Sequence, residues 1–200
     1  MTDRPMALRE WAVAVRALAE GRQAIALRKG GIAEETKEFR LESPSFYLFP
    51  SYEHQRPELV KPNWRAVVDA TRAEAALHPG LVRIEYFAEA EEDIEVSDAD
   101  TLARLSECHI WTDDYAEERL RWKKTKPLHV LLLRVYRLNE PVEVPLRDSY
   151  AGCKSWIRLE DELPVRERKP VLGDAEFAAA AEKVRRAVRE SSQKPGLRFS

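Results

Sequence analysis

The sequence predicts an α+β protein in which a mixed, largely antiparallel sheet or a small open barrel is flanked by helices. Three observations support this fold class. Short apolar runs bounded by turn residues recur along the chain, as expected for strands. Two longer segments, 6–20 and 63–77, carry apolar residues at helical spacing instead. The chain has 200 residues, 44% of them hydrophobic, which is enough for one domain with a substantial core.

The helices are predicted from apolar periodicity and from residues suited to helix ends. In segment 6–20, Leu8 and Trp11 fall on one face, and Gly21 suits the C-terminal end of a helix. The later helices are expected at 63–77, 98–120 and 174–190, with Asn63, Ser97 (in a capping box with Asp100) and Thr112 as N-terminal caps.

The strands are predicted from short apolar runs between turns. The strongest is 128–138, whose first half is apolar on both faces, as expected for a central strand. A Pro-punctuated stretch, 141–145, follows it. The other strands are expected at 23–28, 39–41, 46–49 and 82–87, with a last one ending at Leu159.

The chain divides into a main domain and a C-terminal appendage. Residues 1–162 are predicted to form a single α+β domain, because no break in composition interrupts them. Residues 163–173 are charged and Pro-bounded, which is typical of a linker. Residues 174–200 are expected to be an Ala-rich helix and a frayed tail, perhaps only loosely attached to the domain.

Composition excludes several classes of protein. The net charge is −2, so no global attraction to nucleic acid or to an anionic membrane is expected. The apolar runs are too short to span a bilayer and the N-terminus lacks a signal peptide, which predicts a cytoplasmic protein. Two cysteines and four histidines are scattered, so neither a disulfide framework nor a zinc site is expected.

Arg28, Lys29, Gly30 and Gly31 form a cationic, glycine-rich turn at the end of a predicted strand. Two glycines allow successive N–H groups to point at one anion, and the adjacent cations add charge. The sequence therefore predicts an anion-binding turn here. The alternative is a hairpin turn with solvated basic residues.

Tyr52, Glu53, His54 and Gln55 follow the apolar strand 46–49. Tyr52 can stack on a base, and Gln55 can read a base edge. Glu53 and His54 would be catalytic if the protein is an enzyme, as general base or as metal ligands. The alternative is a surface turn whose side chains cap the next helix.

Lys154, Ser155 and Trp156 form a third polar and aromatic cluster. Lys154 and Ser155 can hold a phosphate while Trp156 stacks on a base. A buried Trp156 within a strand is an equally good interpretation. Cys153 has no identifiable histidine partner, so it is interpreted as a packing residue.

A further aromatic and basic neighbourhood comprises Trp111 and the segment 122–126. Its tryptophans and lysines can contact a nucleic acid backbone or can form a solvated connection between elements. Strand ends can meet at one edge of a sheet, so the Arg28, His54 and Lys154 clusters can share one site, and the sequence leaves open whether they do.

These clusters favour a nucleic-acid- or nucleotide-binding module with an anion site at strand ends. In that reading no cofactor is needed. The first alternative is a metal-dependent phosphodiesterase or nuclease, in which Glu53 and His54 lie near Mg²⁺ or Mn²⁺. The second alternative is a protein-interaction module, for which an exposed apolar patch would be expected. The sequence leaves open whether the protein is an enzyme.

The chain resembles an uncharacterised bacterial family known as a domain of unknown function, which implies no activity. The resemblance covers most of residues 8–160 and rests on the motifs at 28–32, 48–55, 131–136 and 152–156.

A second, shorter resemblance is to ASCH domains, in the segment 21–28. Gly21, Ile25 and Arg28 fit the opening motif of those domains. Gln23, Ala24 and Ala26 stand where that motif has Lys, Thr and Glu. ASCH domains belong to the PUA-like class, small β-barrels associated with binding RNA or modified nucleotides, so this resemblance implies such a barrel.

Overall fold

The computed structural model describes residues 4–29, 39–122, 126–152, 154–161, 163 and 167–190. Within them the strands are β1 (Met6–Trp11), β2 (Ile25–Arg28), β3 (Ser45–Ser51), β4 (Leu81–Val96), β5 (Leu128–Pro145), β6 (Trp156–Arg158) and β7 (Arg168–Pro170). The α-helices are α1 (Ala12–Ala19), α2 (Arg65–Ala76), α3 (Ala99–Arg104), α4 (Asp113–Arg121) and α5 (Asp174–Arg189). Short 3₁₀ turns are η1 (Pro57–Leu59), η2 (Pro62–Trp64), η3 (Ser106–Cys108) and η4 (Asp148–Tyr150).

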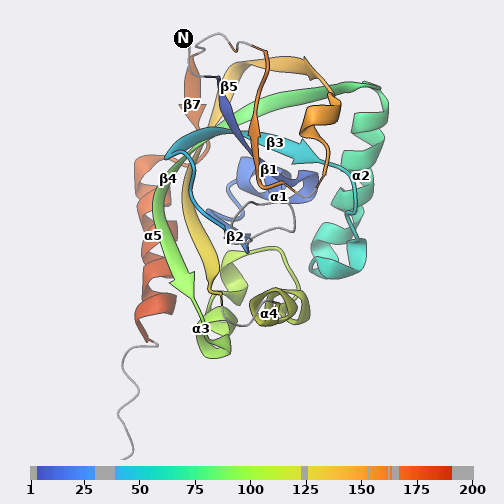
Figure 1. Ribbon diagram of the computed structural model, residues 1–200. Helices are drawn as coiled ribbons and strands as arrows, with labels where there is room; N and C mark the ends of the chain where they lie inside the picture. The colour runs from blue at the N-terminus through green and yellow to red at the C-terminus, as the bar shows by residue number, and fades with distance from the viewer. Residues whose placement is uncertain are drawn as a thin grey trace, which may run out of the picture.

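The described strands form one sheet in the order β2-β5-β4-β3-β1-β6, and β7 pairs with β5 beside this path. Among the described residues, β1 and β3 run parallel, whereas the other named strand pairs are antiparallel. The predicted α+β class with a mixed, largely antiparallel sheet is confirmed. In Figure 1, α5 runs along one side of the sheet and α2 lies at the other.

The sheet is built around the long antiparallel pair β4 and β5. Both strands extend beyond their predicted ends, because the acidic segment after 87 and the Pro-punctuated stretch 141–145 continue the ladder. Between the pairs Ile84–Val142 and Tyr86–Arg137 the register shifts. Pro141 lies in this irregularity. Proline has no backbone N–H to donate, and at this position the ladder does not need one.

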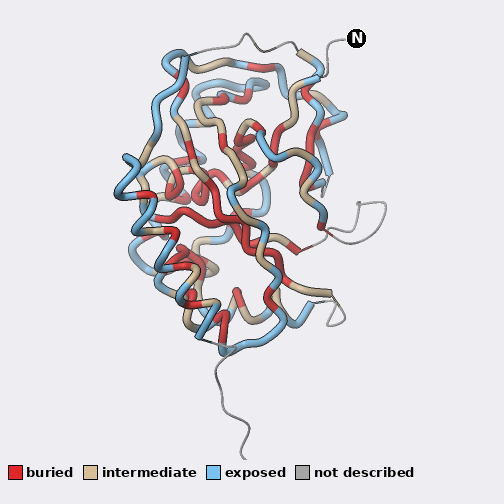
Figure 2. The backbone as a smooth tube through the Cα atoms, turned by 90° about the vertical axis from the view of Figure 1, so that its left-hand side faces the viewer, coloured by how far each residue is buried: buried red, intermediate tan, exposed pale blue. Residues whose placement is uncertain are grey.

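The sheet curls so that strands from its two ends approach each other. Arg28 on the edge strand β2 donates from Nη1 to the Arg9 carbonyl on β1, at 3.2 Å. β1 lies next to the other end of the strand order. Side chains buried between the curled sheet and its helices form the core, and Figure 2 shows their red segments running through the middle of the molecule.

The predicted helix 6–20 is wrong in its first part, because residues 6–11 form the strand β1. β1 has partners on both sides, β3 and β6, which satisfy its backbone hydrogen bonds along its length. Ala7 and Leu8 point to opposite faces and are both fully buried, as in a strand covered on two sides. The helical spacing of Leu8 and Trp11 is real, but tertiary pairing decides the local structure.

Smaller differences concern element ends. The predicted strand 39–41 is absent from the described structure, although Phe39 is buried in the core. Asp98, and not Ser97, caps α3, since its side chain accepts from the Thr101 N–H at 2.8 Å. Thr112 caps α4 as predicted, accepting from the Tyr115 N–H.

The C-terminal region packs tightly against the rest of the molecule. The expected linker contains β7, which pairs with β5, and Val171 donates its N–H to the Val135 carbonyl. α5 then places Phe177, Ala181 and Val184 in the same core cluster as α1 and β2. Ala-rich composition suggested a loose appendage, whereas the buried stripe at helical spacing makes α5 part of the core. Among the described helices, none has the length and apolar character needed to cross a membrane.

We expect Ala181→Asp to lower the free energy of unfolding by about 3 kcal/mol or more, because Ala181 is 1% exposed and the carboxylate has no partner there. Ala179→Asp introduces the same residue on the exposed face of α5 and should cost about 1 kcal/mol or less. Urea unfolding of the two variants measures the difference. Equal effects would mean that α5 is not part of the core.

Candidate nucleotide-binding cavity

A cavity of about 410 Å³ lies where β1, β2 and β3 end. β1 and β3 are parallel, so Trp11 and Ser51 end side by side. β6 runs antiparallel to β1, so the residues that precede β6 reach the same place. The cavity is lined by Arg9, Glu10, Trp11, Leu27, Arg28, Lys29, Ser51, Glu53, His54, Trp111, Tyr115, Arg119, Trp122, Gly152, Lys154 and Ser155.

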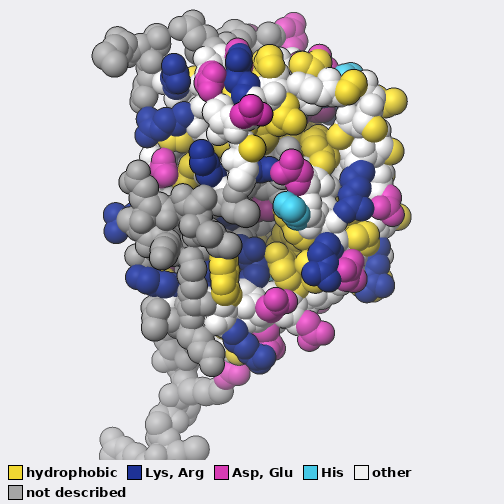
Figure 3. Space-filling view, turned by 45° about the vertical axis from the view of Figure 1, so that its right-hand side comes forward, with side chains coloured by type: hydrophobic (Ala, Val, Ile, Leu, Met, Phe, Trp, Pro, Cys, Tyr) yellow, Lys and Arg dark blue, Asp and Glu magenta, His cyan; other side chains and the backbone are white. Residues whose placement is uncertain are grey.

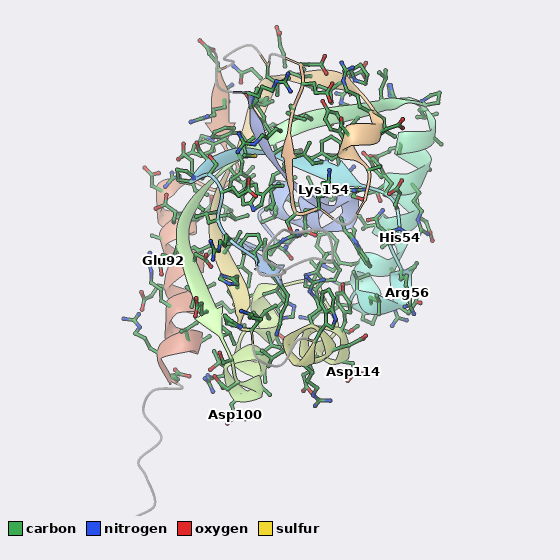
Figure 4. All side chains as sticks on the ribbon, in the orientation of Figure 1. His54, Arg56, Glu92, Asp100, Asp114 and Lys154 are labelled. Carbon is green, nitrogen blue, oxygen red and sulfur yellow. The ribbon has the colours of Figure 1, made fainter. Side chains whose placement is uncertain are left out.

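Three clusters that were identified in the sequence contribute to this one cavity. Its walls include Arg28 at the end of β2 and Lys29 directly after it, Glu53 and His54 after β3, and Lys154 and Ser155 before β6. Figure 4 labels His54 and Lys154, which come from two different connecting segments. Trp111 and Trp122 from the further aromatic neighbourhood also line it. Gly30, Gly31 and Cys153 lie outside the described residues.

Arg9 holds two segments of the cavity wall together. Its Nη1 donates to the carbonyls of Tyr150 and Gly152, and its Nη2 donates to Glu53 Oε2 at 2.9 Å. The Arg9 side chain is 13% exposed, whereas that of Glu53 is 63% exposed. Glu53 is therefore a solvated carboxylate that neutralises a largely buried guanidinium.

Arg28 and Glu10 form a second, more deeply buried ion pair. Arg28 Nη1 lies 3.2 Å from Glu10 Oε2, and the side chains are 12% and 7% exposed. Glu10 Oε1 also accepts the N–H of Trp11 at 2.8 Å. The Arg28 guanidinium stands over the ring of Phe39, 5.8 Å from its centroid. Each of the two cavity carboxylates is thus already paired with an arginine.

Lys29 is the unusual cation of the cavity. It is 2% exposed, and its Nζ donates to the Leu120 carbonyl at 2.5 Å. Burial, followed by the like charge of Arg119, lowers the pKa of Lys29 below its ordinary value. No described carboxylate forms an ion pair with it. A buried ammonium costs stability unless a counter-ion neutralises it.

Aromatic rings form one wall of the cavity. Trp11 and Trp111 meet edge to face with centroids 5.2 Å apart, and Tyr115 lies 5.2 Å from Trp111. Arg119 donates to the Tyr115 hydroxyl at 3.1 Å and lies over its ring. Rings held by one another in this way offer a rigid apolar surface beside the cations.

His54 has a positive φ of 60°, an uncommon conformation for a residue with a side chain. Such a conformation persists when the surrounding structure fixes it, as the neighbouring contacts do here. Gln55 is buried on one side of His54, and Glu53 is held by Arg9 on the other. The His54 side chain is exposed at the edge of the cavity.

Gln55, Tyr52 and Trp156 are not placed in this cavity. Gln55 is 1% exposed, and its Oε1 accepts the N–H of Val13, in the first turn of α1, at 2.9 Å. Trp11, at the N-cap position, gives α1 no side-chain cap, so Gln55 supplies one from another part of the chain. This arrangement contradicts a role for Gln55 in reading a base edge.

Trp156 is buried between Phe39 and Phe46, and its Nε1 donates to the Arg40 carbonyl at 2.7 Å. It therefore cannot stack on a ligand in this arrangement, and the alternative interpretation of a buried strand residue holds. Tyr52 lines a different cavity, beside α1 and α2. Burial raises the pKa of its hydroxyl.

That second cavity, of about 530 Å³, is larger but electrically balanced. Its arginines are Arg16, Arg83 and Arg137, and its carboxylates are Glu20, Glu74 and Glu85. Arg16 pairs with Glu74, and Arg83 pairs with Glu85. Basic and acidic side chains are likewise interspersed on the face shown in Figure 3. A local excess of positive charge distinguishes the cavity at the strand ends.

Sequence reasoning missed Arg9, Glu10, Trp11, Tyr115 and Arg119. The first three were assigned to a helix, which hid the polar end of β1. Arg9 and Glu10 directly follow apolar residues, just as Arg28 and Lys29 follow the apolar residues of β2. This similarity is the signal in the sequence that could have identified the end of β1. Within the described part of the chain, no group of three or more His, Cys, Asp and Glu residues could hold a metal ion.

Residues 7–183 match the model of a family described as a domain of unknown function, DUF1802. No curated protein matches the chain. The resemblance to an uncharacterised family, predicted from four motifs, is confirmed.

Among solved structures, the chain is similar to the ASCH protein from Zymomonas mobilis. The identity is 13% over 79% of this chain and 89% of that chain, with a TM-score of 0.46. Two variants of that protein give 14% and 13% identity with TM-scores of 0.45 and 0.47. They cover 78% and 80% of this chain, and 91% and 92% of theirs. These structures bear the name that residues 21–28 suggested.

Gln55→Ala should lower the free energy of unfolding by about 1–3 kcal/mol, because it leaves the buried N–H of Val13 without an acceptor. Arg56→Ala, at the exposed neighbour whose partner is the surface residue Glu58, should change it by about 0.5 kcal/mol or less. Chemical denaturation measures both. A neutral Gln55→Ala would show that the amide is not needed for the fold.

Lys29→Met should leave the protein as stable as the wild type or more stable at pH 7, because it removes a buried charge that no described carboxylate neutralises. The folded-state pKa of Lys29 is lowered, so the unfolded chain binds more protons between that pKa and the ordinary value of 10.5. Wild-type stability relative to Lys29→Met should therefore rise with pH through this window.

Lys61→Met is the matched control for that measurement. The Nζ of Lys61 donates to the carbonyls of Ser106 and His109, at 2.6 and 3.0 Å, so its loss should destabilise the fold. Urea unfolding from pH 7 to pH 10 compares the two variants. A Lys29→Met protein as destabilised as Lys61→Met would mean that the Lys29 ammonium stabilises the ligand-free fold.

Proposed function

Since the chain belongs to the DUF1802 family, whose description names no activity, we propose from the site itself that it is a nucleotide- or nucleic-acid-binding module. The ligand occupies the cavity at the strand ends. The observation that carries this proposal is one cavity that joins cations without a described carboxylate partner to a wall of aromatic rings. Cations bind the phosphates of a nucleotide, and aromatic rings stack on its base.

The phosphate end of the ligand lies toward Lys29, Arg119 and Lys154. Lys29 and Arg119 are like-charged neighbours, and an anion between them would relieve both the repulsion and the cost of burial. Lys154 is exposed at the cavity, with no ion pair to a described residue, and can move toward a phosphate. None of the three has a carboxylate partner in the described part of the chain, so each can contribute donors to the ligand.

The base lies against the wall of Trp11, Trp111 and Tyr115. Trp11 ends β1, Trp111 directly precedes the N-cap of α4, and Tyr115 lies in the first turn of α4, so two parts of the fold fix their positions. A cavity of about 410 Å³ falls in the size range of small-molecule sites. Stacking on aromatic rings tolerates any base, so recognition of a particular base would come from polar groups such as Ser51 and Ser155.

Binding is favoured over the alternative of a metal-dependent phosphodiesterase or nuclease by the state of Glu53. That alternative needs the Glu53 carboxylate as a metal ligand, with Mg²⁺ or Mn²⁺ beside His54. Glu53 instead accepts from Arg9, which neutralises it. The exposed leucines that suit a protein-interaction module, Leu77, Leu81 and Leu146, lie outside the cavity at the strand ends.

Lys154→Ala should weaken the binding of labelled single-stranded RNA or DNA by roughly three- to tenfold and reduce the salt slope by about 1, because one phosphate contact is lost. Lys169→Ala removes an exposed lysine of β7, outside the cavity, and should leave the affinity unchanged. Fluorescence anisotropy over a salt series measures both.

The same incubation, run with EDTA and with Mg²⁺ or Mn²⁺, tests the enzyme alternative. Shortening of the probe that needs metal and disappears in both Glu53→Ala and His54→Ala would replace the binding module with a nuclease. Failure of every nucleic acid and nucleotide to bind would reject the proposal.

A further inference from the structure

We infer that the ligand presents a terminal phosphate monoester, as a free nucleotide or as a phosphorylated strand end, and not an internal phosphodiester. This inference rests on the proposed function and specifies the ligand class for the same cavity. The two sources share one chemistry, a phosphate group with two negative charges near neutral pH, and the experiment below separates them.

The charge balance of the cavity supports a dianion. Its described lining carries five cations, Arg9, Arg28, Lys29, Arg119 and Lys154, and two carboxylates, Glu10 and Glu53. Both carboxylates are paired, Glu53 with Arg9 and Glu10 with Arg28. Five minus two leaves an excess of three positive charges, on Lys29, Arg119 and Lys154. A phosphodiester carries one negative charge, whereas a monoester carries about 1.5–2 at pH 7.

Burial makes this difference in charge matter. Lys29 is 2% exposed, and burial followed by the like charge of Arg119 lowers its pKa. In such a partly desolvated site each added charge on the ligand interacts more strongly than it would in water. Lys29 Nζ has three N–H donors and spends one on the Leu120 carbonyl, so two remain for oxygen atoms of the ligand. A monoester offers three terminal oxygens to Lys29, Arg119 and Lys154.

Glu53 adds to the discrimination. Its carboxylate already supplies the anion for Arg9, on the open side of the cavity, and it is 63% exposed. A phosphodiester that displaced Glu53 from Arg9 would replace one singly charged anion by another, with no gain in electrostatic attraction. A long phosphodiester backbone would also meet a protein whose net charge is −2, which gives no attraction outside the cavity. The cavity therefore favours a compact dianion that reaches Lys29.

The test compares ligands that differ by one charge. Intrinsic tryptophan fluorescence is titrated at pH 7.5 with each of the four ribonucleoside 5′-monophosphates, with the corresponding 5′-phosphate methyl esters, and with inorganic phosphate. Single-stranded RNA hexamers with a 5′-phosphate or a 5′-hydroxyl form the second arm. We expect at least one monophosphate to bind about tenfold or more tightly than its methyl ester. Preference for the 5′-phosphorylated hexamer over the monophosphate would identify a strand end as the source.

Lys29→Met should reduce the ratio of monoester to ester affinity toward one, while Lys169→Ala should keep the wild-type ratio. Equal affinities for monoester and ester in the wild type, or an unchanged ratio in Lys29→Met, would overturn the inference. If the inference is overturned but RNA with a 5′-hydroxyl still binds to the cavity, the proposed nucleic-acid-binding function is retained. Binding of inorganic phosphate alone, with no gain from any nucleoside, would overturn the nucleotide assignment as well.

Discussion

The buried guanidinium of Arg28 is the interaction on which the architecture of the cavity depends. It joins the edge strand β2 to β1 near the other end of the sheet through the Arg9 carbonyl and the Glu10 carboxylate. The curl of the sheet brings three strand ends together, and this bridge fixes them at the closing point. Removing one partner of such a buried pair generally costs about 3–5 kcal/mol, because the other charge is left alone. The same residues thus close the fold and form the base of the cavity.

Much of the fold was predictable because the relevant signals are local. The apolar runs of β2, β3 and β5, the periodicity of α2 and the cap of α4 all reflect short-range physics. β1 was not predictable in this way. Its helical spacing is contradicted by pairing with β3 and with β6, and β6 lies at the far end of the domain in sequence. The packing of α5 is similar, since an Ala-rich stripe is buried only when a partner surface exists.

The position of the candidate site was more predictable than the contacts of its residues. Polar residues at strand ends identified Arg28, Lys29, His54 and Lys154 as candidates but left open whether they meet, and the structure shows that they line one cavity. Sequence could not separate Glu53, which faces the cavity, from Gln55, which turns inward two positions later to cap α1. It also could not reveal that Lys29 is buried, because burial depends on residues of α4 that lie far along the chain.

The pairing of β1 with β6 has a consequence for biosynthesis. Arg9 is synthesised 141 residues before Tyr150 and 143 residues before Gly152, whose carbonyls it binds. Sheets dominated by such long-range contacts fold slowly, because a large loop must close before its contacts form. During translation the cationic strand ends therefore remain unassembled and their apolar neighbours exposed, a period in which a chaperone would protect the nascent chain. The cavity at the strand ends is therefore completed only after its last lining residues, Gly152, Lys154 and Ser155, have been made.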